Sequence, residues 1–173
     1  MTLTEKSKEY AMGKHRETNH LYDGKPYILH LTEVFHNAQM FYMPIYKLHD
    51  ANLIEVLQSA AYCHDVIEDC RETYNDVAKN TSEQVADIVY ALTNEKGRNR
   101  DERANDKYYH GIKNTPHATY IKLCDRLANV SYSKRMGSSM FDKYRKEHKN
   151  FKSKLYQEGF DVMWVELENL FKD

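Results

Sequence analysis

Apolar side chains recur every three or four residues along most of this chain, which is the spacing that one face of an α-helix produces. Clear examples are Ile28, Leu31 and Val34 in one segment and Leu53 and Leu57 in another. No segment has the pattern of a convincing strand, and we find no internal repeat, low-complexity tract or linker. The pattern predicts helices over residues 4–20, 27–41, 51–67, 73–79, 82–92, 116–136, 141–157 and 161–171.

Turn-forming and capping residues separate these segments. Asp23-Gly24-Lys25-Pro26 is a turn signal, and Met43-Pro44 is expected to break the helix that starts near residue 27. Ser82 suits the N-cap of one helix, and Pro116 suits the first position of another. Gly137-Ser138-Ser139 is expected to end that second helix. The fold class predicted is all-α, with about seven to nine helices.

The length and composition indicate one globular domain. A chain of 173 residues is expected to form a single domain, residues 1–173, with a polar N-terminal surface helix within residues 1–22. Hydrophobic residues make up 41% and charged residues 29%, which argues against general disorder. No apolar run approaches the roughly 20 residues of a transmembrane helix. The N-terminal residues also lack the apolar core of a secretory signal peptide.

The charge balance and the cysteines exclude further classes. Lys and Arg number 25 and Asp and Glu 26, for a formal net charge of -1. A non-specific nucleic-acid binder normally carries a basic excess to neutralise phosphates, so we do not expect nucleic acid as a partner. Without a transmembrane span, we do not expect a membrane either. Cys63, Cys70 and Cys124 are an odd number without CxxC spacing. They argue against a disulfide framework or zinc ribbon and suit a reducing cytoplasm.

Four titratable residues stand at the end of the apolar helix expected over 51–67. His64 continues its apolar stripe, and the pairs His64/Glu68 and Asp65/Asp69 are spaced to share one helix face. Imidazole and carboxylate groups together suit Mn²⁺, Fe²⁺ or Zn²⁺. The alternative is a buried histidine with satisfied hydrogen bonds beside a solvated acidic helix end.

Two distant segments carry residues that would complete a metal site. His30 lies on the apolar face of the helix expected over 27–41, and Asp125 lies in an otherwise apolar helical window. A buried carboxylate such as Asp125 needs a partner. That partner could be a metal, or it could be the adjacent Arg126 in a simple ion pair. With His64 and Asp65, these residues form a set of two histidines and two carboxylates suited to one divalent metal.

Three motifs together resemble a known family. PYILH (26–30), HDVIED (64–69) and IKLCDRLAN (121–129) occur in that order. They are similar to motifs of the HD-domain metal-dependent phosphohydrolases, and most closely to the alarmone hydrolases of the RelA/SpoT type and their small stand-alone relatives. The segments 92–104 and 144–156 also look like a bacterial stand-alone subgroup. The resemblance covers roughly residues 25–173 and implies a helical HD domain.

The resemblance implies an activity and assigns residues to it. The implied reaction removes pyrophosphate from the 3′ position of guanosine tetra- or pentaphosphate, with a metal-activated water. Glu68 and Asp69 would orient the water and handle protons, and Asn129 would contact phosphate or ribose. Four residues would be the metal ligands, with Mn²⁺ as the usual ion of the family: His30, His64, Asp65 and Asp125.

The sequence departs from the family at the nucleotide-binding end. Alarmone hydrolases typically carry an Arg-Lys pair before the turn that leads into the first motif, whereas this chain has Leu21-Tyr22. Tyr22 could still stack on a base, and Lys25 could supply a displaced positive charge. The expected phosphate-binding cations are those of the basic segment 93–104 and of the third motif and its surroundings: Arg100, Arg103, Lys122, and Lys134 or Arg135.

Several functions stay open at this stage. The leading interpretation is a hydrolase of a guanosine or adenosine 3′-pyrophosphate. Other possible substrates are a dinucleotide 2′-phosphate and a nucleoside monophosphate. A non-catalytic nucleotide-binding module would explain the missing Arg-Lys pair, although the Glu68-Asp69 pair argues against it. A structural domain that docks on another protein is the third class.

Overall fold

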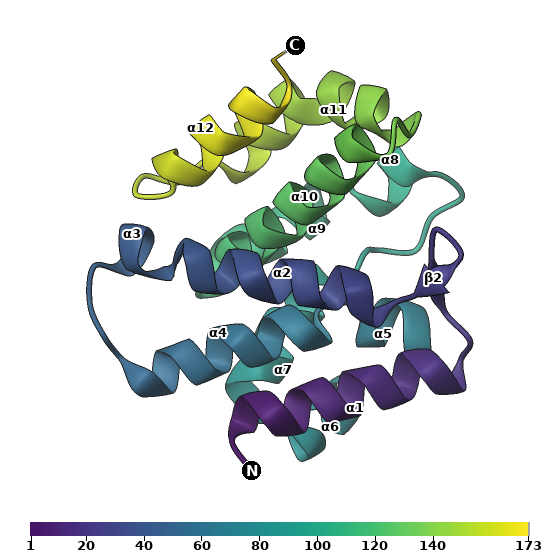
Figure 1. Cartoon of the computed structure of the whole chain (residues 1–173), viewed down its shortest axis with the longest axis vertical. Helices are drawn as coiled ribbons and strands as arrows, with labels where there is room; N and C mark the ends of the chain where they lie inside the picture. Colours follow the sequence, from purple (N-terminus) through teal and green to yellow (C-terminus); the bar gives the residue numbers. More distant parts are fainter. Residues whose placement is uncertain (173) are drawn as a thin grey trace.

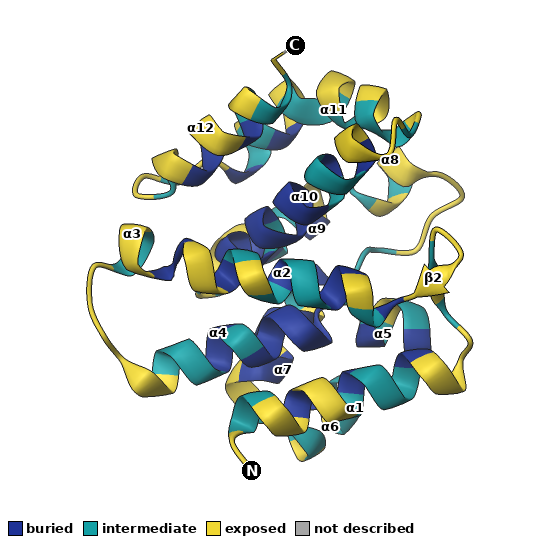
Figure 2. Cartoon of the chain, in the orientation of Figure 1, coloured by how far each residue is buried: buried dark blue, intermediate teal, exposed yellow. Residues whose placement is uncertain are grey.

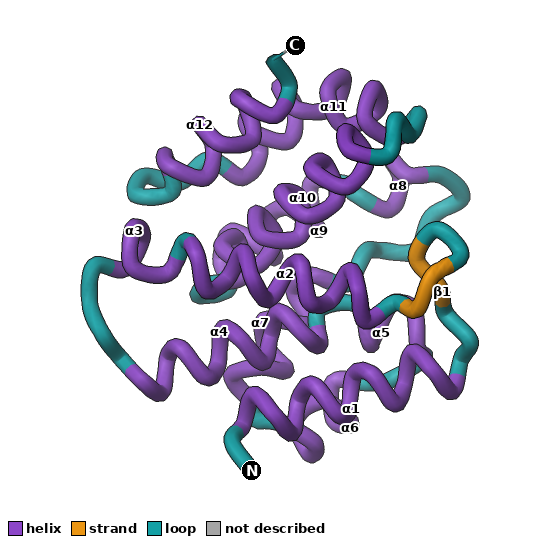
Figure 3. Tube along the Cα trace, viewed as in Figure 1, coloured by secondary structure: helices purple, strands orange, loops and turns teal. Residues whose placement is uncertain are grey.

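Helices form almost all the regular structure of the chain in a computed structural model that describes residues 1–172 (Figures 1 and 3). They are α1 (Leu3–Glu17), α2 (Ile28–Met40), α3 (Tyr42–Tyr46), α4 (Ala51–Cys63), α5 (Val66–Cys70), α6 (Tyr74–Asn80), α7 (Glu83–Leu92), α8 (Arg100–Arg103), α9 (Asp106–Asn114), α10 (Ala118–Arg135), α11 (Met140–Leu155) and α12 (Asp161–Leu170). Three of these, α3, α5 and α8, have five residues or fewer. The predicted all-α fold class is confirmed.

The helices α2, α4 and α10 occupy the centre of the fold. Helix α4 packs against α1, α2 and α7, and α10 packs against α2, α7, α11 and α12. The inner faces of these helices are buried and their outer faces are exposed (Figure 2). Helix α12 covers α10 with Trp164, whose side chain is 1% exposed and packs edge-on against Phe151. Among residues 1–172, no helix combines the length and apolarity that crossing a membrane would require.

A short hairpin leads from α1 into α2. Strands β1 (Leu21–Tyr22) and β2 (Lys25–Pro26) pair antiparallel, although the sequence pattern predicted no strand. The turn predicted there is confirmed, since Asp23 and Gly24 both have positive φ, at 52° and 72°. Two residues per strand are too few for an alternating pattern to be visible in the sequence.

The N-terminal helix is more than a polar surface element. It ends at Glu17, and the backbone N–H groups of Leu3 and Thr4 donate to the Glu55 carboxylate on α4. Its face toward the core buries Ser7, Ala11 and His15. Small and polar residues can line a helix contact, so a weak apolar pattern did not reveal this packing.

Two helix boundaries differ from the prediction. The break between α2 and α3 falls at Phe41, and Pro44 lies in the first turn of α3, where proline needs no hydrogen-bond donor. Pro116 does not begin a helix: His117 has a φ of 66°, and α10 starts at Ala118. By contrast, Ser82 is the N-cap predicted, with its hydroxyl accepting from the Val85 N–H at 3.2 Å.

Candidate metal centre and adjoining cleft

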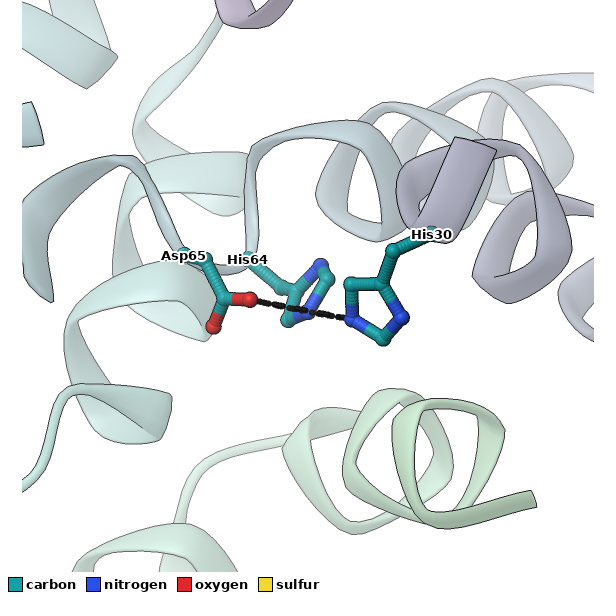
Figure 4. Close-up of side chains that lie close together, drawn as sticks. All are labelled: His30, His64 and Asp65. Carbon is teal, nitrogen blue, oxygen red and sulfur yellow. Dashed lines mark hydrogen bonds and ion pairs between the residues drawn. The ribbon is translucent and has the colours of Figure 1, made fainter. Parts of the chain in front are cut away.

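The predicted continuous helix over 51–67 is interrupted at His64 and Asp65. Helix α4 ends at Cys63, and α5 begins at Val66. Asp65 has φ −106° and ψ −1°, close to the bridge region of φ/ψ space. The expectation that His64/Glu68 and Asp65/Asp69 share a face of one helix is therefore wrong. The turn instead directs His64 and Asp65 together toward α2 (Figure 4).

Two histidines and two carboxylates converge at this turn. The Nε2 atoms of His30 and His64 are 3.3 Å apart, and the Asp65 Oδ2 lies 2.9 Å from His64 Nε2 and 3.8 Å from His30 Nε2 (Figure 4). These three donor atoms lie within 4.8 Å of one another. The Oδ1 of Asp125 approaches from α10, at 3.4 Å from His30 Nε2 and 3.7 Å from His64 Nε2. The structure thus brings the four predicted residues together.

The electrostatics of the cluster favour a cation. Burial opposes the charged imidazolium of His64, but Asp65 and Asp125 beside it raise its pKa to about 9. Burial raises the pKa of Asp65, but the neighbouring imidazoles of His64 and His30 hold it well below its usual range. Negative charge that holds a proton on a buried imidazole can hold a divalent cation there instead, once the imidazole is deprotonated. Two imidazoles with two carboxylates fit such a metal.

Neighbouring groups fix the orientation of these side chains. The His64 Nδ1–H donates to the Ala61 carbonyl at 2.8 Å, which turns Nε2 toward the cluster. The Tyr27 hydroxyl donates to Asp65 Oδ2 at 2.5 Å. Asp125 accepts from Asn129 Nδ2 and from Lys122 Nζ, the latter at 2.9 Å, on separate oxygens. Such second contacts tune metal affinity by holding each donor in place.

Removing the Tyr27 hydroxyl tests this orientation. We expect Tyr27→Phe to weaken binding of a divalent cation about tenfold, because Asp65 loses the donor that holds it. Isothermal titration with Mn²⁺ measures the affinity. The control is Tyr46→Phe, whose hydroxyl bonds the His117 ring at 2.9 Å, away from the cluster. Equal affinities in the wild type and Tyr27→Phe would show that this contact does not position Asp65.

A charged cleft of about 210 Å³ adjoins the cluster. Asp125 belongs to both, and Asn129 lies on the same wall. The cleft brings six of the predicted residues together: Glu68, Arg100, Arg103, Lys122, Asp125 and Asn129. The cleft is also lined by residues that sequence reasoning did not assign to the site, among them Asn94, Arg126, Tyr144 and Glu147.

Glu147 holds two of the cleft arginines. Its Oε1 accepts from Arg100 Nε at 2.7 Å, and its Oε2 accepts from Arg126 at 3.1 Å. The Arg126 guanidinium also lies over the rings of Tyr144 and Phe151. The alternative that Arg126 is the ion-pair partner of Asp125 is wrong, because Lys122 has that place. These pairs span 21 and 47 residues, so no spacing rule could show them.

The two acidic residues that end the HDVIED motif, Glu68 and Asp69, diverge. Glu68 is exposed at the cleft, where its carboxylate accepts from the Asn94 side chain at 2.7 Å. Asp69 faces the end of α1 instead, with Oδ2 3.7 Å from His20 Nδ1. Burial, with the charges of Asp65 and Glu68, raises the pKa of Asp69 to about 7. Asp69 can therefore exchange a proton near neutral pH.

Tyr22 and Lys25 line a separate hollow of about 350 Å³ on the other side of His30. The Tyr22 ring stacks on the His30 imidazole, with centroids 4.7 Å apart, and its hydroxyl donates to Asn129 at 2.7 Å. Lys25 is exposed, and its ammonium lies 3.4 Å from the Tyr132 hydroxyl. These two predicted residues are therefore not in the cleft with the arginines. Lys134 bonds the carbonyls of Leu170 and Lys172 and does not line the cleft.

The fold and this cluster define an α-helical protein with a candidate divalent-metal centre, and comparisons with known proteins find similar proteins. Two curated relatives are named guanosine-3′,5′-bis(diphosphate) 3′-pyrophosphohydrolase MESH1. The one from Drosophila melanogaster is 28% identical over 123 residues, and the one from Danio rerio is 30% identical over 124 residues. A guanosine-3′,5′-bis(diphosphate) 3′-pyrophosphohydrolase of Aquifex aeolicus is 30% identical over 125 residues, which is 16% of its length. No model of a known protein family matches the chain.

A solved structure has the same fold. It belongs to work titled "A metazoan ortholog of SpoT hydrolyzes ppGpp and plays a role in starvation responses" and aligns with a TM-score of 0.74, at 22% identity, over 99% of this chain and 94% of that one. The sequence matches cover 70% of this chain and 64% and 63% of the Drosophila and Danio proteins. The resemblance to stand-alone alarmone hydrolases that the motifs indicated is confirmed.

Proposed function

We propose that this protein is a metal-dependent phosphohydrolase that removes the 3′-pyrophosphate from guanosine 3′,5′-bis(diphosphate) or its adenosine analogue. The observation that carries the proposal is the cluster of His30, His64 and Asp65, with Asp125 shared between it and an arginine-lined cleft. A cation site beside a cleft lined by Arg100, Arg103, Arg126 and Lys122 suits phosphoryl chemistry, because a metal ion and nearby cations can neutralise charge on the phosphoryl oxygens. The names of the sequence relatives support the same substrate class.

His30, His64, Asp65 and Asp125 would hold the divalent metal, and we expect Mn²⁺. Such an ion lowers the pKa of a bound water and neutralises charge on the phosphoryl oxygens. The orienting contacts from Ala61, Tyr27 and Asn129 keep the donor atoms directed inward.

Glu68 and Asp69 divide the proton transfers in this proposal. Glu68, at the cleft and oriented by Asn94, would hold the attacking water and accept its proton. Asp69, whose pKa is raised to about 7, would return a proton to the departing ribose oxygen. An acid with a pKa near the working pH is efficient in this role.

The cleft and the neighbouring hollow would bind different parts of the substrate. Arg100, Arg103 and Arg126 would hold the phosphates in the cleft, with Lys122 beside Asp125. Tyr22 and Tyr132 line the neighbouring hollow and offer aromatic surfaces to a base, with Lys25 at its edge. Asn129, which bonds both Tyr22 and Asp125, lies where the two halves would meet. The nucleoside therefore has an aromatic, weakly charged site that differs from an Arg-Lys pair.

Product analysis tests the function. Mn²⁺-loaded protein is incubated with guanosine and with adenosine 3′-pyrophosphates, and the products are separated by anion-exchange chromatography. We expect pyrophosphate and the corresponding 5′-phosphorylated nucleoside. Turnover of only the adenosine compound would mean that Leu21-Tyr22 changed the base preference. Binding of both without turnover would indicate a nucleotide-binding module.

Arg100 gives a quantitative test of the cleft. We expect Arg100→Ala to raise KM about tenfold with little change in kcat, since one charge-assisted phosphate contact is lost. Steady-state kinetics measures both constants. The control is Arg98→Ala in the same segment, whose side chain is 91% exposed and does not line the cleft. A KM unaffected by Arg100→Ala would remove this arginine from substrate binding.

A further inference from the structure

One carboxylate joins two arginines of the cleft that come from different helices. Glu147 lies on α11, whereas Arg100 begins α8 and Arg126 lies on α10 (Figure 1). The two carboxylate oxygens of Glu147 accept from Nε and Nη2 of Arg100, at 2.7 and 3.2 Å. Its Oε2 also accepts from Nη1 of Arg126 at 3.1 Å. The proposed function assigns the arginines to phosphate binding and leaves this carboxylate without a role.

The two arginines differ in how firmly the rest of the protein holds them. The Arg126 side chain is 8% exposed, and its guanidinium carbon lies 4.7 Å from the ring centroid of Tyr144 and 4.1 Å from that of Phe151. The Arg100 side chain is 47% exposed, and its guanidinium carbon is 5.5 Å from the Tyr144 centroid. Burial and two aromatic rings therefore fix Arg126, whereas Arg100 depends on Glu147 for its orientation.

The charges and donors of this group leave Arg100 able to bind an anion. Burial raises the pKa of Glu147, but Arg100 and Arg126 hold it below its usual range, so the carboxylate is ionised at neutral pH. One carboxylate between two guanidinium groups leaves one positive charge, which the cleft meets at the more exposed Arg100. A guanidinium has five N–H donors, and Glu147 takes two of those of Arg100. The donors on Nη1 and one on Nη2 remain for the oxygens of a ligand.

We propose that Glu147 is a positioning residue that holds Arg100 toward the phosphates of the substrate. This inference rests on the proposed function, because it assumes that phosphates bind in this cleft. Without the carboxylate, the guanidinium groups of Arg100 and Arg126 would repel each other, and the half-exposed Arg100 would turn toward solvent. A charge-assisted contact to phosphate would then be weakened. The competing role, in which Glu147 occupies the arginines in place of phosphate, predicts that its removal strengthens binding.

Binding of inorganic pyrophosphate separates the two roles. Glu147→Gln keeps the size of the side chain but replaces one acceptor oxygen with an NH₂ group, which cannot accept from an arginine. Isothermal titration uses metal-free protein, because pyrophosphate chelates divalent cations. We expect the Kd for pyrophosphate to rise about fivefold in Glu147→Gln. In the metal-loaded enzyme we expect KM to rise by about the same factor with kcat unchanged, a split that a general loss of structure would not give.

A double-mutant cycle tests whether Glu147 acts through Arg100. In the Arg100→Ala background, Glu147→Gln is expected to cause no further rise in the Kd for pyrophosphate. Glu147→Asp is the second variant, because it keeps a negative charge for the buried Arg126 and so protects folding. Its shorter side chain is expected to give a smaller rise in the same direction.

The matched control is Asp142→Asn, which also removes one negative charge from α11. The Asp142 side chain is 63% exposed and pairs with Arg145 at 2.8 Å, and neither residue lines the cleft. We expect its Kd for pyrophosphate to equal that of the wild type. Far-UV circular dichroism checks that each variant is folded.

The outcomes that would overturn the proposal are distinct from those that concern the reaction. Tighter or unchanged pyrophosphate binding by Glu147→Gln would overturn it, and so would an equal rise in the Arg100→Ala background. A wild type that binds no pyrophosphate would overturn it as well. The expected order of affinities, together with a wild type that hydrolyses neither 3′-pyrophosphate, would refute only the proposed function.

Discussion

Asp65→Asn is expected to reduce pyrophosphate release about a thousandfold, the largest effect on activity that we predict. The substitution keeps the size of the side chain but removes the charge that the two imidazoles share, at 2.9 Å from His64 and 3.8 Å from His30. An amide oxygen is a poorer ligand than a carboxylate for a divalent metal of this type. Mn²⁺ content after dialysis is therefore expected to fall together with kcat.

The matched control is Asp87→Asn. Asp87 is an exposed carboxylate on α7 whose contact is the Tyr74 hydroxyl, at 3.0 Å. It is expected to keep both metal content and activity, and far-UV circular dichroism checks that each variant is folded. Full activity of Asp65→Asn, with metal still bound, would rule out the proposed site.

Trp164→Ala is expected to lower the free energy of unfolding by about 3–5 kcal/mol, the largest effect on stability. The indole is 1% exposed and packs against Phe151, so its removal leaves a cavity between α12 and α11. Its Nε1–H has no hydrogen-bond partner among residues 1–172, so the loss comes from packing alone. For a chain of this length, the midpoint of thermal unfolding is expected to fall by about 10 °C.

Val165→Ala is the control on the same helix. This neighbouring side chain is 53% exposed, and its truncation is expected to change stability by less than about 0.5 kcal/mol. Circular dichroism at 222 nm follows both unfolding curves, because Trp164 is the single tryptophan and its fluorescence is lost in the variant. Equal midpoints for the two variants would show that α12 contributes little to the core.

The helices and the four clustered residues were predictable because their signals are local or carried by motifs. Apolar spacing located α2, α4, α7 and α10, and the motif resemblance singled out His30 and Asp125 as partners of His64 and Asp65. Periodicity failed at residues 64–65, because an apolar stripe can continue past the point where one helix ends and the next begins. Proline preferences misplaced the start of α10, since Pro116 suits a turn as well as a first helical turn.

The remaining parts of the candidate site depend on contacts between distant segments. Glu147 joins Arg100 and Arg126 only after α11 has packed beside α10. His20 meets Asp69 only because α1 docks on α4 and α5. Neither contact produces a recognisable spacing in the sequence. Each residue taken alone looks like an ordinary charged or aromatic residue on the surface. Sequence reasoning therefore recovered the centre of the site better than its surroundings.

The convergence of three chain segments has a thermodynamic consequence. Along the chain, His64 lies 34 residues after His30, and Asp125 lies about 60 residues after Asp65. These side chains therefore meet only in the folded state. An unfolded chain cannot present these donors together, so an ion bound here would act as a reversible cross-link between α2, α10 and the end of α4. Free cation at 100 times its dissociation constant would add about 2.7 kcal/mol to folding stability. The concentration of available metal would then set the fraction of the protein that is folded as well as the rate of its reaction.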